Sequence, residues 1–375
     1  MNKLYVVSGE YQPNSAPHNR LVSFLNFFEE RGIDTELIFL YPNWENTKPS
    51  FTYKHIRVTY AYECYRVFNN RVAAKLFTSV IVKRVINKLL PEDNVFVYSG
   101  GLILQRLKRD SKARIFHEMT EHPDVMKWRA RILKRIYLDG CKAVDGLFVI
   151  STALKEFYVS IGIPQEKITI VNMTVDPLRF DGIKKEDVSE KYIAYCGTAS
   201  NNKDGVDKLI EAFSIVSQKH DDVKLFIMGK APTITDEAGN LQLVERLGLK
   251  DKVVFKGVVP AEEMPQLLTN AAILSLARPN NLQAKNGFPT KLGEYLLTGN
   301  PVVVTNVGDI SLFLKDGENA LLAEPDNIQE FADKLCWALE HYQESLKIGA
   351  KGRETALSNF NSNLESQKIV KAIFG

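Results

Sequence analysis

The 375 residues exceed what one hydrophobic core usually supports, so we expect two domains of roughly 150 to 200 residues each. A hydrophobic content of 45% and a charged content of 25% are those of an ordinary soluble protein, and no apolar run approaches the roughly 20 residues of a membrane span. Glu10 interrupts the N-terminus too early for a signal peptide, and the four cysteines form no CxxC pair, so we expect a cytoplasmic protein with reduced thiols and no structural zinc.

Strand and helix patterns alternate through the first 180 residues. Strands are expected at 4–8, 35–40, 94–98, 113–116, 146–150 and 168–171, and an amphipathic helix at 21–31. The loop after the first strand lacks the GxGxxG fingerprint, which argues against a Rossmann dehydrogenase. A polar stretch at 177–190 is the expected linker.

The same alternation restarts after the linker. Strands are expected at 192–196, 223–228, 253–255 and 272–277, helices at 206–217, 240–247 and 264–268, and a mostly helical tail at 327–375. Each half is therefore expected to be a parallel sheet covered by helices. Ligands bind beyond the C-terminal strand ends of such sheets, so two facing halves would form a cleft.

The net charge of +3 conceals an asymmetry between the halves. Residues 1–180 hold 26 Lys and Arg against 18 Asp and Glu, a balance of +8, and residues 181–375 hold 22 against 27, a balance of −5. The basic surplus clusters at 66–88, 106–114 and 127–135, which have helical apolar spacing and could lie on an anionic membrane surface at the inner face. Solvated helix faces of a globular domain explain the same pattern.

The stretch 277–305 reads as loop, short helix, turn and buried strand. Its helix carries Glu294 in its first turn or so and is preceded by Gly287-Phe288-Pro289-Thr290. Free N–H groups and the helix dipole favour a phosphate at that end, where Gly287 permits close approach. A carboxylate beside a phosphate site suits a pair of sugar hydroxyls, and phosphate plus ribose is half of a nucleotide.

This stretch resembles the nucleotide-binding motif of the family 4 retaining glycosyltransferases. Their usual pattern is Glu-x7-Glu with an internal Gly-Phe-Gly and a following Gly-x-Pro-Val-Val, and the chain is most similar to a variant with Phe-Pro-x-Lys-x-x-Glu-Tyr. The matching positions are Gly287, Phe288, Pro289, Lys291, Glu294, Tyr295 and the run 299–303. Asn286 stands where the first glutamate is usual, which departs from the part of the motif that recognises the sugar.

The resemblance implies a GT-B fold: α/β, with two Rossmann-like parallel-sheet domains facing across a cleft. We expect an acceptor-binding domain at 1–180, a nucleotide-sugar-binding domain at 181–355, and a C-terminal helix at 356–375 that crosses back to the first domain. Glu294 would accept hydrogen bonds from the ribose, although an exposed helix glutamate is the alternative. The implied nucleotide-binding set is Gly197, Thr198, Lys203, Val258, Gly287, Phe288, Pro289, Thr290, Lys291 and Glu294.

The loop 197–205 precedes a helix and supplies glycines, hydroxyls and Lys203. Preorganised cations and N–H groups stabilise the charge that grows on a departing diphosphate. The family has a lysine near Lys203 on the diphosphate, and Thr198 stands where its arginine would be. Arg278 or Lys291 could supply the missing cation, while surface loop charges are the alternative for Lys203 and Arg278.

In the first half, 116–123 reads as a loop that follows a strand and is dense in polar groups. His117, Glu118 and Glu121 are candidates to contact the acceptor or to offset positive charge at the reacting carbon, and Asn286 could bind a sugar hydroxyl or cap a turn. A satisfied loop histidine is the alternative for His117. Two histidines and two glutamates could also hold a metal, but GT-B enzymes as a group work without one and no DxD run occurs nearby, so we expect no metal.

The resemblance therefore implies a retaining hexosyltransferase that moves a sugar from a nucleoside diphosphate sugar to a saccharide or lipid-linked saccharide, in cell-surface polysaccharide synthesis. No further cofactor and no nucleic-acid partner are expected. A GT-B nucleotide-sugar epimerase would need acid and base carboxylates and no second substrate. A two-domain α/β binding protein without chemistry is the alternative from another class.

Overall fold

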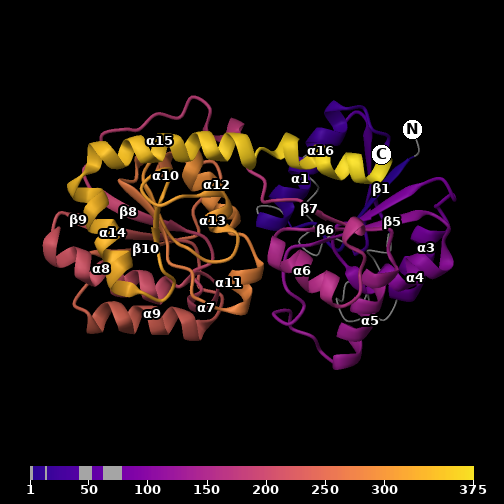
Figure 1. Ribbon diagram of the computed structural model, residues 1–375, viewed down its shortest axis with the longest axis horizontal. Coiled ribbons are helices and arrows are strands. Elements are labelled where there is room, and N and C mark those ends of the chain that lie inside the picture. Colours follow the sequence, from indigo (N-terminus) through magenta and orange to yellow (C-terminus); the bar gives the residue numbers. More distant parts are fainter. Residues whose placement is uncertain (1–2, 13–14, 42–52, 62–77) are drawn as a thin grey trace, which may run out of the picture. The chain divides into compact units, whose positions relative to one another are not determined.

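The computed structural model describes residues 3–12, 15–41, 53–61 and 78–375, and the chain divides into two units (Figure 1). The first unit comprises Met1–Asn172 and Ser362–Gly375, and the second comprises Met173–Asn361. The first unit thus ends ahead of the polar stretch 177–190, where the sequence places the linker. The C-terminal segment that returns to the first unit begins at Ser362, whereas the sequence predicts 356.

The first unit is built on a parallel sheet that has seven strands within the described residues, in the order β3-β2-β1-β4-β5-β6-β7. The strands are β1 Leu4–Ser8, β2 Thr35–Phe39, β3 Ile56–Tyr60, β4 Asn94–Val97, β5 Arg114–Met119, β6 Gly146–Val149 and β7 Ile168–Ile170. The sequence missed β3, because this edge strand carries Arg57 and Thr59 and so lacks the continuous apolar run of a buried strand.

Helices cover both faces of this sheet. They are α1 Ala16–Glu30, α3 Thr78–Ile86, α4 Leu104–Asp110, α5 Arg131–Ala143, α6 Thr152–Ser160 and α16 Ser362–Phe374, with 3-10 turns η1 Gly101–Ile103 and η2 Gln165–Lys167. Ser15 begins α1 by accepting a hydrogen bond from the His18 amide. Phe24 and Phe28 of α1 share a core with Ile369 and Ile373 of α16, which lies beside α1 (Figure 1).

The second unit repeats the architecture with six parallel strands in the order β10-β9-β8-β11-β12-β13. They are β8 Lys191–Cys196, β9 Val223–Met228, β10 Val253–Gly257, β11 Ile273–Leu276, β12 Val302–Thr305 and β13 Leu321–Ala323. The helices are α7 Asn201–Asp204, α8 Val206–Lys219, α9 Ile234–Arg246, α10 Met264–Asn270, α11 Leu282–Asn286, α12 Thr290–Leu297, α13 Ile310–Phe313, α14 Ile328–Glu340 and α15 Tyr342–Asn359, with the 3-10 turn η3 Pro177–Phe180. The predicted strand and helix alternation is confirmed, whereas the three-residue β13 and the short α11 were missed.

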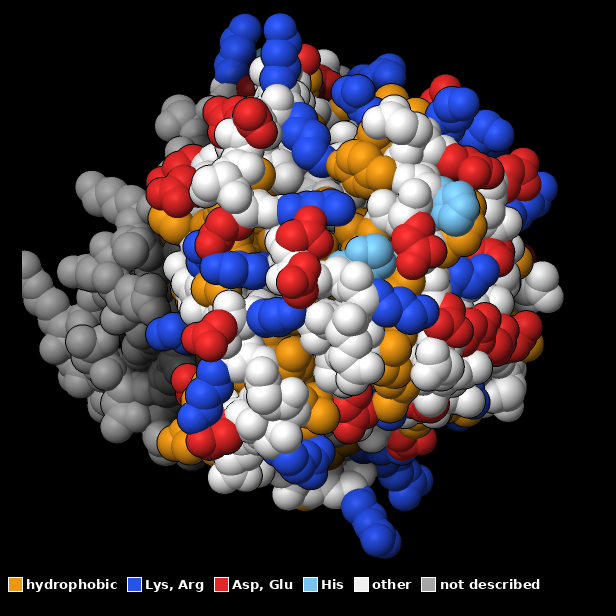
Figure 2. All heavy atoms as spheres, turned by 90° about the vertical axis from the view of Figure 1, so that its left-hand side faces the viewer, with side chains coloured by type: hydrophobic (Ala, Val, Ile, Leu, Met, Phe, Trp, Pro, Cys, Tyr) orange, Lys and Arg blue, Asp and Glu red, His pale blue; other side chains and the backbone are white. Residues whose placement is uncertain are grey.

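Charges of both signs are interspersed on the face of the second unit that Figure 2 shows, and no large area of one sign stands out. Within the described parts of the chain, no helix combines the length and the apolarity needed to cross a bilayer. Arg71 and Lys75, in the predicted basic cluster 66–88, lie outside the described residues, as does most of that cluster. Arg131 and Lys134 lie on α5, where Lys134 pairs with Asp124.

Candidate functional site

The strand order of the second unit reverses between β8 and β11. The chain therefore leaves the C-terminal ends of these two neighbouring strands in opposite directions, which leaves a space between the loops that follow them. Ligands of open parallel sheets bind at such a switch point. Gly197 follows β8 and Arg278 follows β11 after one intervening residue, so two segments that the sequence singles out meet here.

The loop that follows β8 is tightly packed. Gly197 has φ +138°, and a Cβ there would lie 2.4 Å from Lys291 Nζ. Gly205 has φ +66°, and its Cβ would lie 1.9 Å from the carbonyl oxygen of Ala277, so only glycine allows the loop to reach the residue before Arg278. These contacts hold the backbone of 197–205 at the strand ends.

Lys291 is the cation that the structure places at this loop. Its Nζ donates to Asp204 Oδ2 at 2.6 Å and to Tyr195 Oη at 3.0 Å. Burial alone would raise the pKa of Asp204, but the charge and hydrogen bond of Lys291, together with the charge of Arg278, hold it below its usual value. Lys291 thus lies in the first turn of α12 as the charged partner of a buried carboxylate.

Arg278 and Lys203 occupy different surroundings. Arg278 is only 2% exposed, its Nε lies 3.4 Å from the Lys203 carbonyl oxygen, and its own carbonyl accepts from Thr305 Oγ1 at 2.8 Å. Lys203 lies on α7, half-buried, with its amide donating to Ser200 Oγ. The structure therefore brings the backbone of Lys203, Arg278 and Lys291 to one place, with the Arg278 guanidinium buried.

The segment before Glu294 folds as predicted in its main features: α12 begins at Thr290, after Pro289. The Phe288 ring is buried and packs 5.6 Å and 5.4 Å from the rings of Phe313 and Phe360, so only its backbone is available to a ligand. Asn286 is buried at the end of α11, where its Nδ2 donates to the Leu282 carbonyl. That contact corresponds to the turn-capping alternative for Asn286.

Glu294 lies four residues into α12 and forms an ion pair with Arg179 of η3. Burial raises the pKa of the Glu294 carboxyl, and the charges of Arg179 and Lys291 act against that rise. Arg179 Nη2 also lies 3.4 Å from the carbonyl oxygen of Ala261, in the loop that follows β10. The predicted Val258 belongs to the same loop and is 68% exposed.

In the first unit, the prediction of a polar loop over 116–123 is wrong, because β5 continues to Met119 and buries both His117 and Glu118. His117 Nδ1 lies 2.7 Å from the Val97 carbonyl oxygen and Nε2 lies 3.2 Å from Tyr137 Oη, and burial lowers its pKa to about 4. His117 is therefore a satisfied core histidine in this structure.

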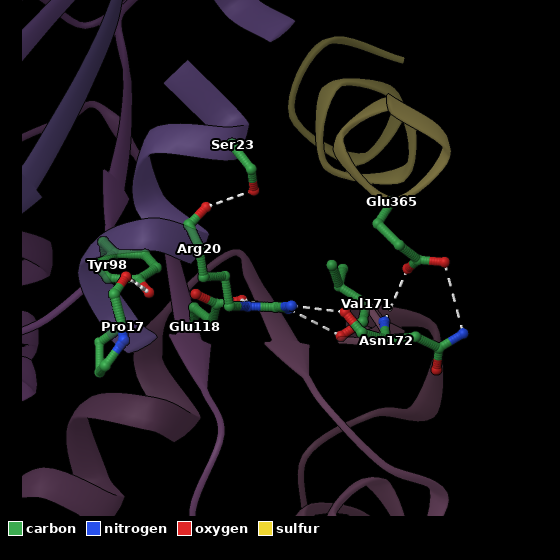
Figure 3. Close-up of polar contacts among 8 residues, drawn as sticks. All are labelled: Pro17, Arg20, Ser23, Tyr98, Glu118, Val171, Asn172 and Glu365. Atoms are coloured by element: carbon green, nitrogen blue, oxygen red, sulfur yellow. Dashed lines mark hydrogen bonds and ion pairs between the residues drawn. The ribbon is translucent and has the colours of Figure 1, made fainter. Parts of the chain in front are cut away.

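Glu118 pairs with a buried arginine of α1 (Figure 3). Nε and Nη2 of Arg20 donate to Glu118 Oε1 at 2.9 and 2.8 Å, and the remaining donors reach the carbonyl oxygens of Val171 and Asn172. Glu365 of α16 accepts from the Asn172 amide at 2.7 Å. The Arg20–Glu118 pair therefore holds the residues that follow β7, and the Glu118 carboxylate is engaged by groups of the protein itself.

The rest of the predicted polar cluster disperses. Glu121 lies half-buried after β5, and His122 Nδ1 accepts from the Asp124 amide while its ring packs on Phe157. Among the residues that the structure describes, no three His, Cys, Asp or Glu side chains gather as metal ligands.

A pocket of about 440 Å³ lies at the corresponding switch point of the first unit, where the strand order reverses between β1 and β4. Ser8 ends β1 and Gly9 follows it, and Tyr98 and Ser99 follow β4, with Ser99 Oγ accepting from the Gly9 amide at 2.7 Å. The remaining lining comes from Glu10, Gln12, Ser15, Pro17, His18, Leu21, Phe39 and Tyr41. Aromatic faces with hydroxyl, amide and carboxylate groups suit a saccharide.

Sequence reasoning missed two of these features: Arg179 and the Asp204 partner of Lys291. Glu294 and Arg179 are 115 residues apart in the chain, so no local motif joins them. Asp204 and Gly205 lie within the singled-out loop, and a carboxylate among its expected cations was the available signal.

Comparisons with known proteins find glycosyltransferases that are similar to this chain. Residues 190–341 match the family model described as Glycosyl transferases group 1. Mannosylfructose-phosphate synthase of Agrobacterium fabrum is 25% identical over 190 residues, 49% of this chain and 40% of that protein. The MMP alpha-(1->4)-mannosyltransferase of Mycolicibacterium hassiacum is 23% identical over 72% of this chain and 66% of that protein. The matched segments span less than two thirds of either relative.

Among solved structures, Anabaena Alr3699/HepE in complex with UDP aligns with a TM-score of 0.75 at 17% identity, over 99% of both chains. Sucrose-phosphate synthase from Thermosynechococcus elongatus aligns with a TM-score of 0.77 at 14% identity, over 99% of this chain and 98% of that one. With the two parallel-sheet units, these likenesses show that the chain has the GT-B fold.

Proposed function

We propose that this protein is a retaining glycosyltransferase that transfers a sugar from a nucleoside diphosphate sugar to a saccharide or a lipid-linked saccharide. The observation that carries the proposal is the meeting of the loop 197–205, Arg278 and Lys291 at the switch point, with Glu294 one turn further along α12. Cations at strand ends suit a diphosphate, and a carboxylate one helical turn away suits a ribose.

The chemistry follows from charge. As the bond between the sugar and the diphosphate stretches, negative charge grows on the leaving oxygens, and donors fixed in advance lower the barrier. Lys291 is such a donor because Asp204 and Tyr195 fix its amine before a ligand arrives. Arg278 contributes positive potential from its buried position beyond β11, and the Lys203 side chain on α7 supplies a third cation.

The acceptor belongs, in this proposal, to the pocket of the first unit. Tyr41 and Tyr98 are partly exposed and offer aromatic surface to a sugar, and Glu10 and Gln12 offer hydrogen-bond partners. Glu121 remains a candidate for contact with the acceptor, and Asn286 for contact with the donor sugar. His117 and Glu118 are assigned structural roles instead, because their polar atoms are buried against Val97, Tyr137 and Arg20.

We further propose that turnover needs no divalent metal, because Lys291 and Arg278 provide the positive charge that a metal would otherwise bring to a diphosphate. UDP and UDP-glucose are the ligands named for the HepE structures, so UDP-sugars are the first donors to test.

The purified chain should be incubated with UDP-, GDP- and ADP-sugars, with and without saccharide acceptors, while release of nucleoside diphosphate is followed. Transfer predicts release that depends on acceptor, and NMR of the product should show that the anomeric configuration of the donor is kept. Conversion of a nucleotide sugar to its epimer without acceptor would establish the epimerase alternative. Binding without any conversion would establish the non-catalytic alternative.

A further inference from the structure

Arg179 is the described hydrogen-bonding partner of the Glu294 side chain. The Nη1 of Arg179 bonds Glu294 Oε1, and Nη2 lies 3.4 Å from the Ala261 carbonyl oxygen. Both side chains are mostly buried, with 31% and 25% of their surface exposed. One guanidinium therefore joins the carboxylate on α12 to the loop after β10.

The backbone holds Arg179 in this place from both sides. Asp176 caps η3 by accepting from the Leu178 amide at 3.0 Å, and Phe180 is buried at the other end. Upstream, Val175 packs against Gly293, the neighbour of Glu294, so closely that a Cβ on Gly293 would lie 2.2 Å from Val175 Cγ1. The segment that carries Arg179 thus packs directly against α12.

The surroundings of Glu294 make this partner important. Burial favours the protonated carboxyl, and the charged groups that act on it are Arg179 from η3 and Lys291 from its own helix. Lys291 is already bonded to Asp204 and Tyr195. Arg179 is therefore the group that both neutralises the Glu294 charge and fixes the direction of its oxygens.

We propose that Arg179 is a positioning residue, which keeps the Glu294 carboxylate ionised and aimed at the ribose hydroxyls of the donor and ties it to the loop after β10. This inference rests on the proposed function, since it assigns a nucleotide to the site. A ribose diol needs an acceptor at a defined angle, and a carboxylate already bonded through Oε1 presents Oε2 at low entropic cost.

The test compares the affinities of four proteins for a nucleoside diphosphate and its 2′-deoxy analogue by calorimetry. The proteins are the wild type, Arg179→Gln, Arg179→Lys and the matched control Arg246→Gln, an exposed arginine on α9. The probe is whichever of UDP, GDP and ADP the wild type binds. Arg179→Gln should weaken binding of the ribonucleotide about tenfold or more and the deoxy analogue much less, so the preference for ribose shrinks.

The pH dependence of nucleotide binding distinguishes the effect of Arg179 on the charge of Glu294 from its effect on the orientation of that carboxylate. In Arg179→Gln, Glu294 loses its main counter-charge, so binding should weaken as the pH falls from about 8 to about 5.5, because only the ionised carboxylate accepts both hydroxyl hydrogens. Arg179→Lys keeps a cation and should keep a flat profile, with part of the ribose preference lost because its amine lacks the planar fork. Arg246→Gln should match the wild type throughout.

Three results would overturn the inference. The first is a folded Arg179→Gln that keeps the wild-type preference for the ribonucleotide over the deoxy analogue. The same holds if Arg179→Lys keeps that preference and the affinity of both variants is independent of pH. Arg179 would then have no influence on Glu294. The second is a loss of affinity that is equal for the ribonucleotide and the deoxy analogue but absent for the nucleoside, which lacks phosphate. That result would mean that Arg179 binds phosphate itself. Failure of the wild type to bind any of the three nucleotides would reject the proposed function, and this inference with it, whereas the first two results leave that function standing.

Discussion

The Nζ of Lys291 lies 2.6 Å from Oδ2 of Asp204, although the two residues are 87 positions apart. This contact joins the helix that carries Glu294 to the loop after β8, and it places the amine where a Cβ on Gly197 would stand. A buried carboxylate that holds a lysine in position also reduces the net positive charge of the site. The proposed phosphate site is therefore a preformed ion pair with further cations around it.

Lys291→Met should weaken UDP binding about tenfold or more, because a charged hydrogen-bond donor at the diphosphate is lost. Lys203→Met should weaken it less and should lower turnover more than affinity if its half-exposed amine meets charge that develops only in the transition state. Calorimetry with UDP and uridine measures the first effect, and steady-state kinetics the second.

Removal of Lys291 alone leaves the buried Asp204 carboxylate without its ion pair, with a hydrogen bond from Tyr195 Oη remaining, so Lys291→Met combined with Asp204→Asn is the control for general damage. If the double variant regains UDP affinity, the single variant reported on folding and not on phosphate binding. Equal losses for UDP and uridine would contradict a phosphate role for Lys291.

Glu294→Gln should raise the dissociation constant for UDP by a factor that corresponds to about 1.5 to 3 kcal/mol, since the ribose hydroxyls lose a charged acceptor. The 2′-deoxy analogue should lose less, because it offers one hydroxyl fewer. Calorimetry with both nucleotides gives the comparison. Unchanged affinity for UDP would remove Glu294 from the nucleotide site.

The parts of the fold that the sequence predicts are those encoded by local patterns. The buried runs at β1, β9 and β12, and the start of α12 to within one residue, follow from apolar spacing and from the Gly-Phe-Pro-Thr that was expected to precede the helix. The position of the loop 197–205, which we propose binds phosphate, follows from the strand, glycine and helix order around Gly197. These features depend on neighbours within a few residues.

What the sequence did not predict depends on distant partners. His-Glu at 117–118 resembles loop composition, yet both residues lie within a strand, because Arg20, 98 residues earlier, neutralises Glu118 in the core. The role of Arg179 depends on its contact with α12, and that contact requires Gly293 to lack a side chain. Pairing of charges across a fold leaves no periodic signal along the chain.

His117 should make the stability of the protein depend on pH. Burial lowers its pKa from 6.5 to about 4, so the folded form stays neutral while the unfolded chain takes up a proton as the pH falls through 6.5. The stabilisation is complete above 6.5 and is lost as the pH falls toward 4. Urea unfolding at pH 7.5 and 5 should show the wild type losing about 2 kcal/mol more than His117→Gln.

If His117 were instead a catalytic group, His117→Gln would abolish turnover at pH 7.5 in a protein that remains folded. Our assignment predicts a variant that is less stable at neutral pH and retains turnover when assayed well below its unfolding temperature.

Turnover should survive chelation. EDTA should leave the rate of donor consumption unchanged, because Lys291 and Arg278 supply positive charge at the switch point without an ion. The matched control adds magnesium or manganese to the treated protein, and neither ion should change the rate. Loss of activity in EDTA that a divalent ion restores would contradict the metal-free proposal.

The basic first half should bring the protein to anionic lipid. Its balance is +8, and each Lys or Arg near such a surface contributes about 1 kcal/mol, so a few charges on one face are sufficient. Arg131 and Lys134 of α5 are the described members of the predicted face, and Arg71 and Lys75, outside the described residues, are the others. The second unit, with charges of both signs on the face that Figure 2 shows, should contribute little.

Co-sedimentation with anionic and zwitterionic vesicles across a salt series tests this attraction. The wild type should pellet with anionic vesicles at low salt and be released as the Debye length falls from about 10 Å at 0.1 M to about 3 Å at 1 M. A variant with glutamine at the four basic positions should pellet less, whereas glutamine at four exposed basic positions of the second unit should change nothing. Because Lys134 already pairs with Asp124, Arg131→Gln should account for more of the loss than Lys134→Gln. If the wild type stays in solution with anionic vesicles at low salt, the charge asymmetry is a solvated surface and the case for a lipid-linked acceptor loses its support.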